Sequence, residues 1–392
     1  MTLPKAWNTI HRHAMLPAAD HDEQVRFDVI AGLNHFMSQR MTPEVEKAWR
    51  TRVRPAWLAR EGRAPRDRHE VHAAMRGAPE WQLWSLVRRH TMEMRQHAGR
   101  ALVGRQADTL RERAASFNAD CDTLRLNPSL PIPRYVSTVD THLMRGGYTA
   151  ASTPGDVSNP ANYDAGMYAT TGGSAGPSND AAGRALVAWL RTHRANFSPR
   201  RIIDLGCGLG HNSVPVHRAF PEAQMIAVDV AEPMLRYGHA RARALGCTAL
   251  RFLQVDATET GLEAGSADLV FTTIVLHETS REALPRIFAE AHRLLRPGGL
   301  TVHLEQPPYH GLDPFEQFMR DWDGRYNNEP FWSALHETRL PEVLQSVGFE
   351  RSRIFESQTQ PPSDRQNERP AAEKENFGRA PSWYVVGAEV PL

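Results

Sequence analysis

The apolar positions divide the chain into a helical N-terminal part and a C-terminal part in which strands alternate with helices. Within residues 1–120 apolar side chains recur at helical spacing, so amphipathic helices are predicted there. One helix is expected to begin at Thr42-Pro43 and end at Pro55, and another to begin at Pro79. The apolar faces of the first helix in the chain and of the helix at Pro79 are predicted to be Val29, Ile30, Leu33, Phe36 and Met37, and Trp84, Val87, Thr91 and Met94.

From residue 180 onward, short apolar runs are separated by amphipathic segments. Continuous apolar strands between helices indicate a parallel sheet with both faces covered. The predicted strands are 201–204, 224–229, 249–255, 268–275, 300–305, 349–355 and 383–389, and the predicted helices are 180–195, 211–220, 232–244 and 280–295. The last two strands are expected to pair antiparallel at the sheet edge, with 357–381 as a loop. The fold class is α/β: a doubly wound, mostly parallel seven-stranded sheet with an antiparallel last strand, plus an N-terminal helical domain.

Between these parts, residues 126–179 are rich in turn-forming residues. We predict an N-terminal helical domain at 1–125, a linker or cover segment at 126–179 and a Rossmann-like domain at 180–392. Tyr163 and Tyr168 of the cover segment are candidate ligand contacts, and a plain linker is the alternative.

Charge and cysteine content narrow the functional class. The 392 residues carry a formal net charge of +1, so nucleic-acid or membrane partners are not expected. The chain has 3 cysteines without a C-x-x-C spacing and no long apolar run, which favours a reducing, cytoplasmic protein. Oligomeric state is open; a homodimer through the N-terminal helices is one expectation.

The stretch IIDLGCGLG at 202–210 is the strongest signal for a ligand site. Gly206, Gly208 and Gly210 let the backbone approach a ligand closely after the first strand. Asp204 before the turn would repel a pyrophosphate but favour a cationic ligand head. Asp229, which ends the second strand, is suited to bind both hydroxyls of a ribose. The turn also lacks the third glycine at the spacing typical of dinucleotide sites, which argues against NAD.

Four motifs in order resemble class I S-adenosylmethionine-dependent methyltransferases of the small-molecule branch: DLGCGLG at 204–210, AVD at 227–229, QVDA at 254–257 and RPGG at 296–299. The resemblance implies S-adenosylmethionine as cofactor and S-adenosylhomocysteine as product. It implies the glycines and Asp204 near the methionine part, Asp229 on the ribose and Asp256 on the adenine. The other implied cofactor-binding residues are Cys207, Val230, Ala257 and Thr272.

Catalytic candidates lie where the fourth and fifth strands of the predicted sheet end. VLHET gives His277 and Glu278, and the segment resembles that of O-methyltransferases carrying a histidine base, although the acid is glutamate and the usual tryptophan is absent. An unperturbed imidazole pKa near 6.5 would suit proton removal. The acceptor is expected to be a small molecule. Its predicted contacts are Glu305, Tyr309 and His310, together with a cap loop at 321–332 that contributes Asp321, Tyr326, Asn327 and Asn328.

Other functions remain open at this level. His277 could instead contact the acceptor in a C- or N-methyltransferase. A metal-assisted enzyme of the 2-oxo-acid type would use His277, Glu278 and His303 or His310 as ligands, but no metal site is predicted. Outside methyl transfer, the alternatives are an NAD-dependent oxidoreductase and a non-catalytic binding protein. The acceptor molecule and its reacting atom cannot be read from the sequence.

Overall fold

A computed structural model describes residues 6–360 and 382–392, and within them eight strands form one sheet in the order β1-β4-β3-β2-β5-β6-β8-β7. Neighbouring strands from β1 to β6 are parallel, whereas β8 is antiparallel to both β6 and β7. The strands are β1 (Leu124–Arg125), β2 (Arg201–Leu205), β3 (Gln224–Asp229), β4 (Arg251–Gln254), β5 (Ala267–Thr273), β6 (Leu295–Glu305), β7 (Ile354–Thr359) and β8 (Trp383–Glu389). The predicted mostly parallel sheet with an antiparallel strand is confirmed.

Several details of the sheet differ from the prediction, and β6 begins at Leu295, five residues before the predicted strand 300–305. β1, which has only two residues, adds an eighth strand that is too short to give an apolar pattern. β7 begins at Ile354 because the η7 turn (Arg351–Arg353) precedes it, and it extends to Thr359, three residues into the predicted loop 357–381. Residues 361–381 of that loop lie outside the described part of the chain.

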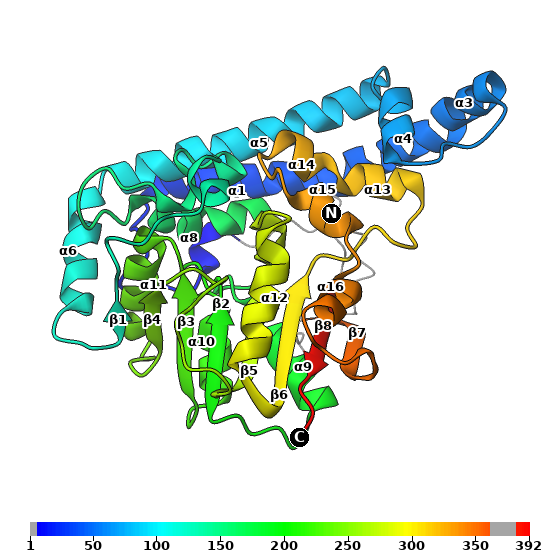
Figure 1. Cartoon of the computed structure of the whole chain (residues 1–392). Coiled ribbons are helices and arrows are strands. Elements are labelled where there is room, and N and C mark those ends of the chain that lie inside the picture. Colours follow the sequence, from blue (N-terminus) through cyan, green and yellow to red (C-terminus); the bar gives the residue numbers. More distant parts are fainter. Residues whose placement is uncertain (1–5, 361–381) are drawn as a thin grey trace.

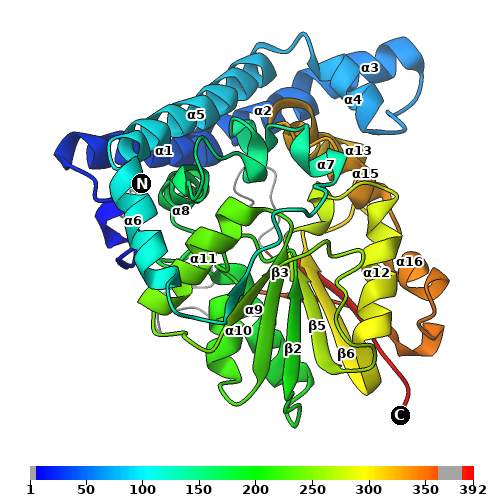
Figure 2. The same cartoon turned by 60° about the vertical axis from the view of Figure 1, so that its left-hand side comes forward.

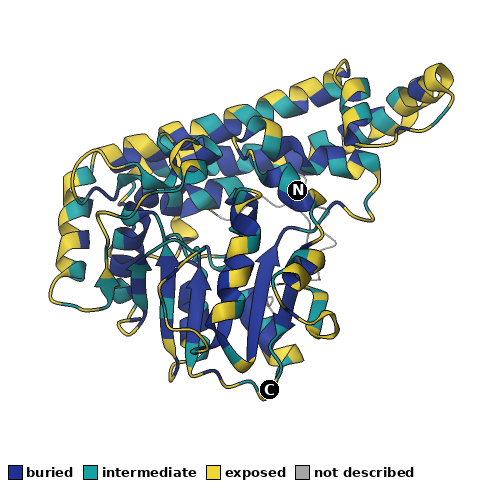
Figure 3. Cartoon of the chain, in the orientation of Figure 1, coloured by how far each residue is buried: buried dark blue, intermediate teal, exposed yellow. Residues whose placement is uncertain are grey.

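Helices cover both faces of the sheet, as expected for parallel strands. Ile202 packs into a core that includes side chains of α9 and α10, whereas its neighbour Ile203 packs into a core that includes α12 and α16. Because successive side chains of a strand point to opposite faces, one strand serves two cores. These helices and the adjacent α11 are α9 (Ala181–His193), α10 (Ser213–Ala219), α11 (Glu232–Ala244), α12 (Ala283–Leu294) and α16 (Leu340–Ser346). Figure 3 shows the central strands largely buried, and every residue of β5 is buried.

A second layer of helices lies across the carboxyl ends of the strands (Figures 1 and 2). It brings together N-terminal helices and the segment after β6. Its α-helices are α1 (His21–Phe36), α2 (Thr42–Ala48), α3 (Arg54–Glu61), α4 (Arg68–Met75), α5 (Pro79–Gly104), α6 (Ala107–Asn118), α7 (Arg134–Ser137), α8 (Ser158–Thr171), α13 (Pro314–Arg320), α14 (Trp322–Tyr326) and α15 (Trp332–Glu337). Among the described residues, none of the helices has both the length and the apolar character that a bilayer crossing requires.

The proline signals near the N-terminus act differently from the prediction. The chain stays helical from α1 to α3, and the π-helical turns η2 (Met37–Met41) and η3 (Trp49–Val53) precede Pro43 and Pro55 respectively. A proline lacks a backbone N–H and crowds the preceding turn. A wider turn just before it accommodates the ring. Pro55 therefore begins α3 instead of ending a helix.

The buried faces of α1 and α5 are also shifted from those predicted. Val29 and Phe36 are 50% and 47% exposed, whereas Phe27 and Ile30 are buried. On α5, Trp84 and Thr91 are buried as predicted, Met94 is exposed, and Arg88 and Arg95 occupy the buried face. The arginines escaped the prediction because spacing of apolar residues alone defined the face.

The cover segment 126–179 contains the buried helix α8 and the 3-10 turns η4 (Thr141–Leu143) and η5 (Gly147–Thr149). The segment 321–332, expected to be a loop, includes α14, and its Trp322 and Asp323 are buried against α5. The division into three parts at 125 and 179 stays a prediction.

Candidate active site

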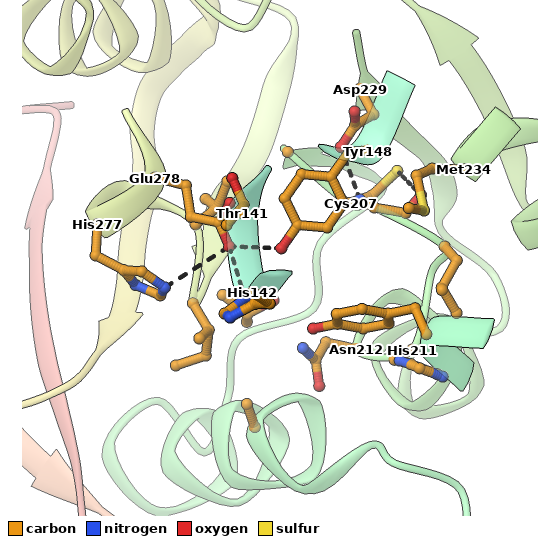
Figure 4. A pocket seen from close by; sticks show the side chains of 18 of the residues that line it. Thr141, His142, Tyr148, Cys207, His211, Asn212, Asp229, Met234, His277 and Glu278 are labelled. Carbon is orange, nitrogen blue, oxygen red and sulfur yellow. Dashed lines mark hydrogen bonds and ion pairs between the residues drawn. The ribbon is translucent and has the colours of Figure 1, made fainter. Parts of the chain in front are cut away.

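A cavity of about 260 Å³ lies at the carboxyl ends of β2, β3 and β5, beneath α5, α8 and the cover segment. Its walls come from segments far apart in the sequence. The glycine turn and Asp229 line one part of it, and His277 and Glu278 line another. Figure 4 shows these side chains pointing into a common space.

The glycine turn forms the part of the cavity next to β3. Gly206 has a φ of +79°, and a Cβ there would lie 2.6 Å from Cγ2 of Val275, so only glycine fits. Asp229 accepts backbone N–H groups from Gly208 at 2.8 Å and from Ala231 at 2.9 Å, one on each carboxylate oxygen. Each oxygen keeps lone pairs for a ligand hydroxyl. Val230, Asp256 and Ala257 line the same cavity.

Asp204 lies beneath this turn and does not line the cavity. It is fully buried, and the hydroxyl of Ser213 donates to its Oδ2 at 2.6 Å. Burial raises its pKa to about 7. Asp204 thus lies behind the cavity surface, and its place near the methionine part of the cofactor stays a prediction. Thr272 and Gly210 are likewise behind the surface, whereas Cys207, whose thiol pKa is raised by burial, lines it.

The end of β5 positions the candidate base. Ile274 has a φ of +56°, which is strained for a β-branched residue, and the turn η6 (Leu276–Glu278) follows. This turn directs His277 and Glu278 to the cavity. His277 donates from Nδ1 to Oε1 of Glu305 at 2.9 Å, which leaves Nε2 facing Glu278 and Glu329, both at 3.8 Å.

The charge state of His277 differs from the expected one. Burial alone would lower its pKa, but Glu305, Glu329 and Glu278 together raise it to about 9. The imidazolium is thus the main form near pH 7 in the protein without ligands. The unperturbed value near 6.5 assumed from the sequence was wrong because the carboxylate of Glu305 comes from a different strand.

A second histidine, which the sequence interpretation missed, lies opposite His277. His142 in η4 is 3.3 Å from Glu278 through Nε2 and 3.0 Å from Glu329 through Nδ1. Burial alone would lower its pKa, but Glu329 and Glu278 raise it to about 10. Tyr148 donates its hydroxyl to Glu278 at 2.6 Å. In Figure 4 the contacts of His277, His142 and Tyr148 converge on Glu278.

Residues 202–299 match the family described as "Methyltransferase domain". This segment is a class I S-adenosylmethionine-dependent methyltransferase domain. The match begins in β2 and includes the glycine turn, Asp229 and His277. It gives no support to the alternative of an NAD-dependent oxidoreductase.

Several curated relatives are similar over this methyltransferase domain. A malonyl-[acyl-carrier protein] O-methyltransferase of Xylella fastidiosa is 38% identical over 104 residues, which cover 26% of this chain and 34% of the relative. A demethylmenaquinone methyltransferase of Thermus thermophilus is 34% identical over 28% of this chain and 49% of the relative. The chain thus spans less than half the length of each. A solved phosphoethanolamine N-methyltransferase 2 of Haemonchus contortus, in complex with S-adenosyl-L-methionine, is 18% identical, with a TM-score of 0.39 over 53% of this chain and 52% of that one.

The residues predicted to bind the acceptor lie around the methyltransferase domain's cavity without lining it. Glu305 is buried behind His277, His310 is exposed, and Tyr309 donates its hydroxyl to Asp321 at 3.1 Å. Tyr326, Asn327 and Asn328 also lie outside the lining. From the predicted cap segment, only Glu329 and Trp332 line the cavity.

His303 and His310, the alternative further metal ligands, do not join His277 and Glu278. His303 is buried within the sheet, where its two ring nitrogens contact the hydroxyls of Thr272 and Thr301, each at 2.9 Å. Within residues 6–360 and 382–392, no group of three or more His, Cys, Asp or Glu side chains is arranged to hold a metal ion.

The cover segment contributes cavity residues that no sequence motif marked. Tyr135, Thr141, His142 and Tyr148 line the cavity, as does the predicted contact Tyr163, whereas Tyr168 is buried in a separate core. His142 follows an aspartate-threonine pair in a segment without periodicity, so it gives no local signal. Its φ of +54° shows that the turn is held in an unusual conformation.

Proposed function

We propose that this protein transfers a methyl group from S-adenosylmethionine to the oxygen of a small-molecule acceptor, with His277 as the general base. The observation that carries the proposal is that one cavity joins the glycine turn and Asp229 to the hydrogen-bonded pair of His277 and Glu305. The domain match supports the cofactor, and the side chains around His277 support the proton transfer.

The residues of the first part of the cavity fit S-adenosylmethionine. Gly206 and Gly208 present backbone without side chains, and Asp229 and Asp256 line the same cavity. In this proposal Asp229 would bind the ribose hydroxyls and Asp256 the adenine amine. Tyr135 lies near both acids, since after burial Asp256 and Asp229 are the charges that raise its pKa. When bound, this cofactor supplies a methyl group activated by a sulfonium, which becomes a thioether as the methyl leaves.

His277 is placed to accept the acceptor's proton at Nε2. Its Nδ1–H is fixed by Glu305, so the ring is oriented and the positive charge formed on proton transfer is stabilised. In the protein without ligands His277 is already protonated to a large extent. A cation bound beside it disfavours the imidazolium, so cofactor binding lowers the pKa of His277 toward the working range.

C- or N-methylation is the second candidate. It is favoured by the raised pKa of His277, because an imidazolium can donate a hydrogen bond to the acceptor without removing a proton. The carboxylates of Glu278 and Glu329 would in that case balance its charge.

Binding and transfer can be tested separately. Calorimetry is expected to show binding of S-adenosylmethionine and S-adenosylhomocysteine and none of NAD. Radiolabelled methyl transfer to a panel of alcohols, phenols, carboxylic acids, amines and enolisable ketones then identifies the acceptor atom. Binding of NAD instead of S-adenosylmethionine would overturn the assignment. Cofactor binding without transfer to any class would favour the non-catalytic alternative.

Association through the N-terminal helices stays a prediction. α1 and α5 expose apolar side chains, among them Val29, Phe36, Leu83 and Leu86. Light scattering after size exclusion distinguishes a monomer from a homodimer.

A further inference from the structure

One cationic side chain lines the cavity but has no role in the proposed binding of cofactor or in the proposed proton transfer. Arg95 of α5 lines the cavity and is only 3% exposed. Its Nε and Nη1 atoms are buried and have no hydrogen-bond partner among the described residues. An isolated buried charge is costly, so a guanidinium in this state needs a partner that residues 6–360 and 382–392 do not supply.

The described residues around Arg95 leave space for its guanidinium but place no carboxylate beside it to balance the charge. The ring of Tyr163 lies under it, with 5.9 Å between Cζ and the ring centre. At Gly166 on α8, a Cβ would lie 2.6 Å from Nε of Arg95, so the absence of a side chain there makes the space. Apart from burial, which lowers the pKa of Arg95, the groups that act on it are Tyr163 and Tyr148, and neither is a carboxylate.

Arg88, two helical turns earlier on the same face of α5, shows how this protein treats a buried arginine that serves the fold. It is 4% exposed and donates from Nη2 to Oδ2 of Asp323 at 2.8 Å. Its guanidinium also lies 4.1 Å from the ring centre of Trp322. The contrast between the two arginines separates a structural ion pair from a cation that faces the cavity.

The acids of the cavity do not occupy this position. Glu278 is bound by Tyr148 and His142, and Glu329 by His142 and Asn327. With these groups committed to one another, Arg95 is, among the described residues, a lining cation that remains available to a ligand. Met92, Tyr163 and Met167 line the same cavity. Guanidinium geometry matches the paired oxygens of a carboxylate or a phosphate.

We propose that Arg95 anchors an anionic group, a carboxylate or a phosphate, of the methyl acceptor. The inference rests on the proposed function, because it takes the cavity beside His277 as the acceptor site. The acceptor is then an acidic small molecule held at one end by Arg95, with the atom to be methylated directed to His277. Arg95 sets the acceptor class, whereas the glycine turn and Asp229 serve the cofactor.

Three probes that share one phenyl ring test this in the complex with S-adenosylhomocysteine: benzoate, phenyl phosphate and neutral benzamide. We expect at least one anion to bind with an affinity at least tenfold higher than that of benzamide, measured by calorimetry at constant ionic strength. The better of the two anions identifies the acid class. Arg95→Met should abolish the preference and Arg95→Lys should retain part of it, with S-adenosylhomocysteine affinity unchanged in both.

Thermal unfolding supplies a readout that a structural arginine would not give. Removing an unpartnered buried charge is expected to raise the Tm of the unliganded protein by about 2 °C or more in Arg95→Met. The matched Arg88→Met variant should lower the Tm, because it leaves Asp323 buried without its partner. Equal binding of benzamide and both anions, or a lowered Tm in Arg95→Met, would overturn the anchor. Failure to bind S-adenosylhomocysteine in the same titrations would instead overturn the proposed function.

Discussion

His277 and Glu305 are held together by a buried contact of 2.9 Å between Nδ1 and Oε1, although they come from the ends of different strands. The contact fixes the ring and raises the pKa of His277 to about 9, together with Glu329 and Glu278 and against the effect of burial. His142, which contacts Glu278 and Glu329, and His336 are further titratable groups near the ring. This pair determines how the proposed activity depends on pH.

The first prediction concerns that pH dependence. A base must be neutral, so kcat/KM for S-adenosylmethionine, which reports the protein without cofactor, should rise with pH through about 9, the value for His277 in the free protein. The midpoint of kcat should lie lower, because a bound cation disfavours the imidazolium. Glu305→Gln should move the kcat/KM midpoint downward. A profile that is flat from pH 6 to 10 would contradict the base.

The second prediction is that His277 matters for turnover and little for cofactor binding. His277→Ala should lower kcat by about 10² to 10⁴, the usual contribution of a general base. The affinity for S-adenosylhomocysteine, measured by calorimetry, should stay within a few-fold. The control is His310→Ala, because His310 is exposed and its loss should not disturb the fold. His303→Ala is unsuitable, because that ring is buried within the sheet. An unchanged kcat in His277→Ala would make His277 a packing residue. A loss that chelators reproduce in the unmodified protein would favour the metal-assisted reaction.

The third prediction concerns the cofactor. Asp229→Ala should weaken S-adenosylmethionine binding at least tenfold, since a hydrogen bond to a carboxylate contributes about 1.5–3 kcal/mol. The variant also removes the acceptor of the Gly208 and Ala231 N–H groups, so the turn loses support. Asp229→Asn keeps one oxygen, so its affinity for S-adenosylmethionine should fall between those of the unmodified protein and Asp229→Ala. Calorimetry that finds equal affinities for all three proteins would exclude Asp229 from the site.

The fourth prediction uses the buried acid beneath the turn. The folded pKa of Asp204, about 7, lies above the usual value for an unfolded chain, so the folded state binds the proton more tightly. Stability contributed by this group is therefore lost as pH rises from about 4 through 7. Asp204→Asn, which can still accept from Ser213, should raise the Tm at pH 8 and change it little at pH 4. A Tm lowered equally at both values would show that the charged form is required.

The fifth prediction locates the segments that respond to ligand. Hydrogen exchange with S-adenosylhomocysteine and benzoate should show new protection in 138–150, where His142 and Tyr148 line the cavity. In 321–332 the change should be confined to residues near Glu329 and Trp332, because Trp322 and Asp323 are already buried. Protection that increases uniformly across 321–332 would restore the mobile cap expected from the sequence.

Local sequence patterns determined the framework of this protein. Continuous apolar runs predicted the strands from β2 to β6, since a strand buried on both faces needs apolar residues at every position. The glycines of 206–210 and Asp229 were identified from short stretches of sequence. Closely spaced glycines after a strand indicate a close backbone approach to a ligand, and an acid at the end of the next strand indicates a contact with it. His277 was found in the same way, from its place after β5.

Only the tertiary structure decided which side chains share the cavity and which charges they carry. Glu305 was assigned to the acceptor but lies behind His277, because its direction depends on the pairing of β6 with β5. Arg95 and His142 enter the cavity from helices and turns that have no local mark of function. The burial of Arg95 and His142 and the raised pKa of His277 arise from contacts between residues far apart in the chain. Such contacts produce no periodic pattern in the sequence, so the sequence alone could not predict them.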